Sequence, residues 1–174
     1  MGQWVFIIIC VMSASAWSAP LKLETQFGRI YVPEQKGWEL GRDMFGMPFI
    51  LFSPQVNGQR SNISFTNTGV DLEISLGAMS KNPDGYKKVK QEWADEVNAT
   101  PQSYLPYKRW QNEHGHAVHE IGFEYLHEGK PYVEKSYYID CRGRLVYAKS
   151  LRLKLNSQHD KEFLNLIKEA DCAL

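Results

Sequence analysis

The 174-residue sequence lacks net charge, because 20 lysines and arginines balance 20 aspartates and glutamates. A neutral chain has no overall electrostatic attraction for nucleic acid or for an anionic membrane surface, so we expect neither as a partner. The sequence also lacks the glycine-rich patterns of phosphate and dinucleotide sites and the Gly-X-Ser-X-Gly pattern of serine hydrolases. With no catalytic pattern present, the sequence predicts a non-enzymatic protein without a cofactor.

Long apolar runs are scarce too. One run, Trp4 to Met12 (WVFIIICVM), stands near the start of the chain and precedes the small residues of SASAWSA. It is shorter than the about 20 residues that cross a bilayer, but it suits the hydrophobic region of a secretory signal peptide. We predict a signal peptide over residues 1–18, although no lysine or arginine precedes the run; the alternative is a buried N-terminal strand or helix. Residues 19–174 would then form a single domain with no integral membrane span, in the periplasm or secreted.

The rest of the sequence alternates strand and helix patterns, without a repeat or linker that would divide it. Apolar or alternating segments bounded by Pro, Gly and Asn predict strands. These cover residues 29–33, 47–54, 61–68, 107–111, 117–127, 132–140 and 145–155, with an Asn57-Gly58 turn between the second and the third. The last four are predicted to form an antiparallel meander. Segment 71–79 fits either a strand or a helix.

Two helices are predicted, each from an apolar stripe at helical spacing. The first runs from an N-cap at Asn82 to about Asn98, and the second follows an N-cap at Ser157, with Asp160 in the capping-box position. The stripes consist of Tyr86, Val89, Trp93 and Val97 in the first helix, and of Phe163, Leu166, Ile167 and Ala170 in the second.

Cysteine is rare: the chain has three, and the predicted cleavage removes Cys10. Cys141 and Cys172 would then enter a compartment that oxidises thiols. The closing helix follows the last strand and would run back along it, which returns Cys172 toward Cys141. A bond between them would close a loop of about 30 residues and contribute about 3–4 kcal/mol in the chain-entropy model. We predict a Cys141–Cys172 disulfide, with metal ligation by the two cysteines as the alternative.

Three histidines are concentrated in residues 112–120, NEHGHAVHE. Imidazole and carboxylate groups are common metal ligands, and a tight hairpin tip would bring His114, His116 and Glu113 together. Such a site would lack the ligand spacing of the known zinc signatures. His119 is expected to face the core with a hydrogen bond, because it alternates in phase with apolar residues along a strand. We favour a polar hairpin and predict no catalytic residue and no metal site here.

Two other features of the predicted meander bear on function. Glu120 and Glu124 share one strand face, which we expect to be its wet side. The aromatic residues fit either partner contacts or a two-sided core, and we favour the core. They are Trp110, Tyr125, Tyr132, Tyr137, Tyr138 and Tyr147.

A set of short motifs spans about residues 27–170: Gly37-Trp38, Ser53-Pro54, Arg60, Asn62-Ile63 and the helix from Phe163 to Ile167. With the meander and the two helices, they resemble the PsbP/Mog1-like superfamily, and more narrowly its small secreted bacterial members of unknown function. The resemblance implies an α/β (α+β) fold, an α/β/α sandwich with a central antiparallel sheet. The strand at 145–155 agrees with it, since Val146 and Ala148 are apolar on one face and leucines on the other.

The superfamily implies little about activity, because its members share non-enzymatic binding rather than a residue set. We expect a secreted or periplasmic accessory domain that acts on a protein partner or a cell-envelope complex. The alternative, from another class, is a histidine-dependent metal-binding protein or a metal hydrolase.

Overall fold

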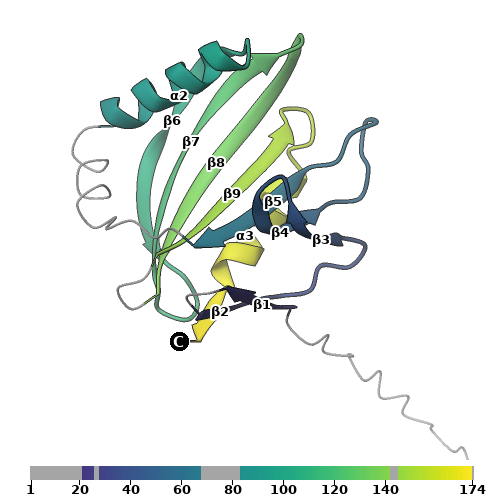
Figure 1. Ribbon diagram of the computed structural model, residues 1–174, viewed down its shortest axis with the longest axis vertical. Helices are drawn as coiled ribbons and strands as arrows, with labels where there is room; N and C mark the ends of the chain where they lie inside the picture. Colours follow the sequence, from purple (N-terminus) through teal and green to yellow (C-terminus); the bar gives the residue numbers. More distant parts are fainter. Residues whose placement is uncertain (1–20, 26–27, 68–82, 142–144, 174) are drawn as a thin grey trace, which may run out of the picture.

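The structure, a computed structural model, describes residues 21–25, 28–67, 83–141 and 145–173; the predicted signal peptide, Asn82 and segment 71–79 lie outside these ranges. The strands in these ranges form two antiparallel sheets (Figure 1). A seven-stranded sheet has the order β3-β4-β5-β9-β8-β7-β6, and a three-stranded sheet has the order β1-β2-β10. No helix of the described ranges is long and apolar enough to span a membrane.

The small sheet comprises β1 (Leu21–Thr25), β2 (Gly28–Val32) and β10 (Asp171–Ala173). The large sheet comprises β3 (Glu39–Met44), β4 (Met47–Phe52), β5 (Asn62–Asn67), β6 (Thr100–Gln111), β7 (Ala117–His127), β8 (Lys130–Asp140) and β9 (Leu145–Leu153). The helices are α2 (Asp84–Glu96) and α3 (His159–Lys168). The predicted antiparallel meander is confirmed as β6 to β9.

Strands β1 and β3 were not predicted, and among the strand boundaries that differ from the prediction those of β6 and β9 change the sheet most. β6 begins at Thr100 rather than at residue 107, although it contains Pro101 and Pro106. Proline is tolerated because β6 is an edge strand in the described sheet, and its register with β7 shifts at both prolines. β9 ends at Leu153, so Leu155, which we placed on the buried face of the strand, is exposed.

The two helices pack on opposite faces of the large sheet, which confirms the α/β/α sandwich. Val118 of β7 belongs to the core cluster under α3, whereas Phe123 and Tyr125 of the same strand belong to the cluster under α2. Odd and even positions of a strand point to opposite faces, so the two clusters lie on opposite sides. Figure 1 shows α2 across one end of β6, β7 and β8, and α3 at the other end of the molecule.

The larger core lies between α3 and the sheet, where Phe163, Leu166 and Ile167 are almost completely buried. The predicted capping box does not form, because α3 begins at His159 and no side chain caps its first turn. Asp160 instead accepts hydrogen bonds from Nε and Nη2 of Arg152 in β9, at 2.7 and 2.6 Å. The carboxylate of Asp160, which was predicted to cap the helix, therefore forms an ion pair with the sheet instead.

The helix α2 is attached by fewer buried residues, chiefly Tyr86 and Ala94. Val89, which we placed in the apolar stripe, is 60% exposed. Lys90 turns toward the sheet in its place and forms a buried ion pair with Glu134 of β8. Its ammonium also lies 5.2 to 5.9 Å from the ring centroids of Phe123, Tyr86 and Trp93. The charge pair explains why the helix presents a lysine, and not a valine, to the sheet.

Motifs that carry the family resemblance position the start of α3. The indole of Trp38 contacts the rings of His159 and Phe163 edge-on, with centroids 6.0 and 5.6 Å apart. Ser53 Oγ accepts a hydrogen bond from the Ser61 backbone, and Ser61 Oγ lies 2.7 Å from His159 Nδ1. Trp38 is partly buried and the other side chains are buried, so their role is to hold the helix on the sheet.

Candidate functional site

The histidine-rich hairpin between β6 and β7 caps the end of α3. Asn112 is buried, and its side-chain amide donates to the Ala170 carbonyl at 2.7 Å. Its Oδ1 accepts from the backbone N–H groups of His114 and His116, and the Glu113 N–H donates to the Lys168 carbonyl at 2.9 Å. The last carbonyls of a helix have no partner within the helix. The hairpin tip thus satisfies acceptors that α3 leaves open.

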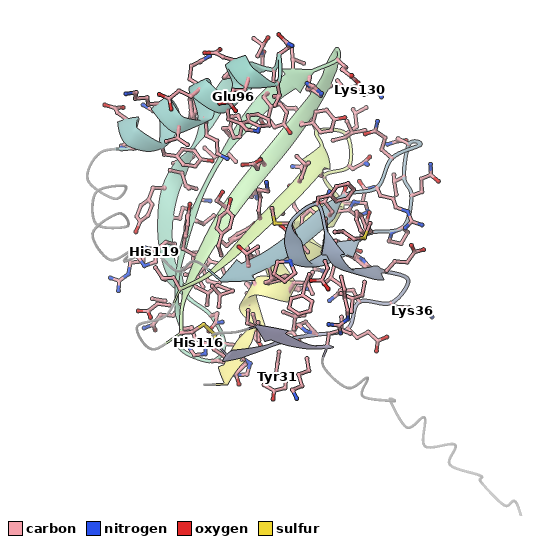
Figure 2. All side chains as sticks on the ribbon, viewed as in Figure 1. Tyr31, Lys36, Glu96, His116, His119 and Lys130 are labelled. Carbon is pink, nitrogen blue, oxygen red and sulfur yellow. A yellow bond between two sulfur atoms is a disulfide. The ribbon has the colours of Figure 1, made fainter. Side chains whose placement is uncertain are left out.

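The side chains of this hairpin meet Asp171 rather than Glu113. His116 Nε2 lies 3.0 Å from Asp171 Oδ1, and His114 Nδ1 lies 3.8 Å from Asp171 Oδ2. The hydrogen bond with His116 holds the pKa of the Asp171 carboxyl below its usual value. Figure 2 shows His116 close to the C-terminal strand, far from Glu96 and Lys130 at the opposite end of the sheet. In the ranges that the structure describes, no group of three or more His, Cys, Asp and Glu is arranged to hold a metal.

His119 lies on the face of β7 that also carries Ile121, Phe123 and Tyr125, as the strand alternation predicts. Its Nδ1 is 2.6 Å from the hydroxyl of Tyr107. Partial burial lowers the pKa of His119 and raises that of Tyr107, so both groups are favoured in their neutral forms. Partial burial and the hydrogen bond with Tyr107 therefore account for His119 as part of the packing of the sheet.

Cys141 follows β8 and Cys172 lies in β10. The structure places them at disulfide distance, with Cα atoms 5.7 Å apart, as the prediction requires. The strand β10 was not predicted; it follows α3 and pairs with β2, which brings Cys172 to the edge of the larger core.

The same face of the sheet that α3 covers continues beyond the helix as a hollow lined with charges. Directly paired residues on β7, β8 and β9 form successive rungs across this face. Four rungs show the change: Val118–Ile139–Val146, Glu120–Tyr137–Ala148, Gly122–Lys135–Ser150 and Glu124–Val133–Arg152. The first rung is apolar and belongs to the core under α3. The last two carry lysine, arginine and glutamate in a cavity of about 250 Å³. We call this hollow the charged groove and define it by Lys108, Glu120, Glu124, Lys135, Arg152 and Asp160.

The charges of the groove are of both signs, and all but the exposed Lys108 are at least partly buried. The side chains of Glu120 and Lys135 are 14% and 22% exposed, and Lys135 Nζ lies 3.9 Å from Glu120 Oε1. Glu124 accepts hydrogen bonds from Lys154 and Ser103 at 2.7 and 3.0 Å, and these contacts lower its pKa. Ion pairs therefore offset part of the cost of removing these groups from water.

The backbone of β6 and β7 gives the groove its apolar wall. A register shift between Leu105 and Lys108 displaces β6 at Pro106, and both Leu105 and Pro106 line the cavity. Gly122 permits this approach, since a Cβ there would lie 3.1 Å from Leu105 Cδ1 and 2.4 Å from the Glu134 carbonyl oxygen. Bulges next to sites commonly redirect side chains. The groove thus combines an apolar wall with a charged floor.

The groove was not predicted from the sequence. We placed Glu120 and Glu124 on a wet strand face, but their side chains are only 14% and 20% exposed. A signal was present: strands with apolar groups on both faces interrupt that pattern with charges at 120, 124, 135 and 152. The register that brings these positions together comes from strand pairing, which the sequence alone does not give.

No protein-family model and no curated protein sequence matches the chain. Solved structures do: LpqN of Mycobacterium tuberculosis, described as involved in cell envelope biogenesis, superposes with a TM-score of 0.58 at 13% identity, covering 83% of each chain. The cyanobacterial PsbP (CyanoP) of Synechocystis sp. PCC 6803 superposes with a TM-score of 0.58 at 8% identity, covering 92% of this chain and 96% of the other. The chain has a PsbP-like α+β fold, as the sequence resemblance implied.

Proposed function

We propose that this protein is a non-enzymatic accessory domain of the cell envelope, periplasmic or secreted, that binds a protein partner through the charged groove. The observation that carries the proposal is the groove itself. Lys135 is partly buried and Arg152 is buried, on a sheet face that is apolar two rungs from Lys135, at Val118, Ile139 and Val146. Burying charge costs free energy unless it is compensated, and a binding surface gives a reason to keep charges in this position.

Three observations support an envelope location. LpqN, which shares the fold, is described as involved in cell envelope biogenesis. The Cys141–Cys172 pair suits an oxidising compartment, and the apolar run near the N-terminus suits a signal peptide.

Co-purification tests this proposal. The tagged protein is expressed in its native host and isolated from the envelope fraction, and partners are identified by mass spectrometry. A variant with both Lys108→Met and Lys135→Met serves as the comparison, and Lys88→Met on the outer surface of α2 serves as the control. We expect a stoichiometric protein that is recovered with the wild type and with Lys88→Met but lost with the double variant. Recovery of a stoichiometric metal and no protein would favour the metal-binding alternative instead.

A further inference from the structure

Most charged groups of the groove have their hydrogen bonds assigned within the protein. Arg152 donates from Nε and Nη2 to Asp160, and from Nη1 to the carbonyls of Leu153 and Lys154 at 3.0 Å each. Glu124 accepts from Ser103 and Lys154. The donors of Arg152 and the carboxylate of Asp160 are therefore occupied, and the charge of Glu124 is paired with Lys154.

Two lysines differ from the rest. Lys135 Nζ lies 3.9 Å from Glu120 Oε1 and 3.8 Å from Asp160 Oδ1, which is beyond hydrogen-bond distance. Lys108 is exposed and stands opposite Glu120 across the β6–β7 pair. Within the described ranges neither ammonium donates a hydrogen bond. Glu120 uses Oε2 to accept from Trp110 Nε1, and Glu124 uses Oε2 for both of its hydrogen bonds. The groups without an assigned hydrogen bond in the described ranges are therefore two ammonium groups and one oxygen each of Glu120 and Glu124, and the charge of Glu124 is already paired with Lys154.

The two ammonium groups that donate no hydrogen bond favour an anionic ligand, and the surroundings limit its charge. A phosphate group carries about −1.5 to −2 charges at neutral pH, and it would face Glu120 and Asp160 on either side of Lys135. A carboxylate carries a single charge and needs only the two ammonium groups, so the repulsion that it meets is smaller.

The size and the walls of the groove limit the ligand further. The cavity of about 250 Å³ is below the range of about 300–1,000 Å³ in which small-molecule pockets fall. Its wall of Leu105, Pro106 and Val133 is apolar. It therefore suits a single side chain with an aliphatic stem and a charged end.

We propose that the charged groove binds an acidic side chain of a protein partner, with the carboxylate between Lys108 and Lys135 and the aliphatic stem against Leu105 and Val133. The inference rests on the proposed function and specifies the chemistry of its partner. The partner segment presents an exposed glutamate flanked by apolar residues.

Backbone-amide NMR tests this inference directly. The nitrogen-15-labelled protein is titrated with the peptide acetyl-Ala-Leu-Glu-Leu-Ala-amide, and with a matched peptide in which glutamine replaces the glutamate. We expect shifts in β6, β7 and β8 around the groove, and binding that is about ten-fold weaker for the glutamine peptide because a charge-assisted hydrogen bond is lost. Added salt should weaken only the glutamate peptide.

Two variants and one control keep the test decisive. Lys135→Met and Lys108→Met should each weaken the glutamate peptide about ten-fold. Lys88→Met should leave its affinity unchanged, although Lys88 Nζ also lies 3.9 Å from a carboxylate, that of Glu92. Equal affinity for the two peptides, shifts outside the groove, or no effect of either groove variant would overturn the inference. So would inorganic phosphate that binds the groove more tightly than the peptide. Failure here, with a partner still recovered by co-purification, would leave the proposed function standing.

Discussion

Two halves of one sheet face have opposite compositions. Under α3, the face carries Val118, Ile139 and Val146, which are at most 4% exposed. Two rungs further along the same strands, it carries Lys135, and one rung beyond that Arg152. Both halves lie on the same face of the same paired strands, and they differ in that α3 covers only one of them.

The difference shows what each half contributes. A helix that removes a surface from water favours apolar side chains there, at about 25 cal/mol per Å² of apolar area. The half beyond α3 contains ion pairs, and such pairs contribute little net stability. We therefore assign stability to the covered half, and the proposed binding concerns the charged groove.

The largest effect is expected from Phe163→Ala in α3. Its side chain is fully buried against Trp38 and the sheet, and removing it leaves a cavity. We expect a loss of about 3–5 kcal/mol in the free energy of unfolding, measured by urea denaturation. Leu155→Ala is the control, because Leu155 is exposed and should change the value by about 0.5 kcal/mol or less. Equal losses for the two variants would contradict the role of α3.

The next effect concerns the edge of the covered half, where Cys141 and Cys172 meet. Replacing both by serine opens a loop with a sequence separation of 31 residues. We expect the free energy of unfolding to fall by about 3–4 kcal/mol. Wild-type protein with a reductant should match the variant. Peptide mapping without reductant that finds both thiols free would refute the disulfide.

Two lysines can be compared at β8: Lys135 belongs to this strand and lies in the groove, whereas Lys90 reaches the strand from α2 on the opposite face. Lys90 pairs with Glu134 beneath α2, where the glutamate side chain is 4% exposed. Lys90→Met leaves that carboxylate buried without its cation and should lower the free energy of unfolding by about 3 kcal/mol. The double variant Lys90→Met with Glu134→Met should recover much of this loss. If Lys90→Met were as stable as the wild type, the buried lysine and the groove lysine would not differ in their contribution to stability.

A smaller loss of stability, which depends on pH, is expected when Glu124 in the groove is replaced. The hydrogen bond from Lys154 lowers the pKa of Glu124, so the pair stabilises the fold above the unfolded pKa of about 4.3 and is lost as the pH falls through the lower, folded pKa. Glu124→Gln should cost about 1 kcal/mol or less at pH 7, and this difference should disappear in acid. A difference that persists at the lowest pH would exclude ionisation as its cause.

Much of the fold follows from local patterns, while the groove does not. The strand from Ala117 to His127 and the apolar side of α3 are apparent in the alternation and spacing of single segments. The histidine hairpin was predicted as a polar tip, but its contact with Asp171 joins residues 55 positions apart. The groove depends in the same way on strand register, and on the bulge at Pro106 that no local pattern predicts.

The most direct test of the account is Lys135→Met, with unfolding and peptide binding measured on the same preparation. Lys135 is partly exposed and makes no hydrogen bond within the described residues. The account predicts a change of about 1 kcal/mol or less in the free energy of unfolding, together with about a ten-fold loss of affinity for the glutamate peptide. A stability loss as large as that of Lys90→Met, with unchanged affinity, would make the charged groove a structural feature and contradict the account.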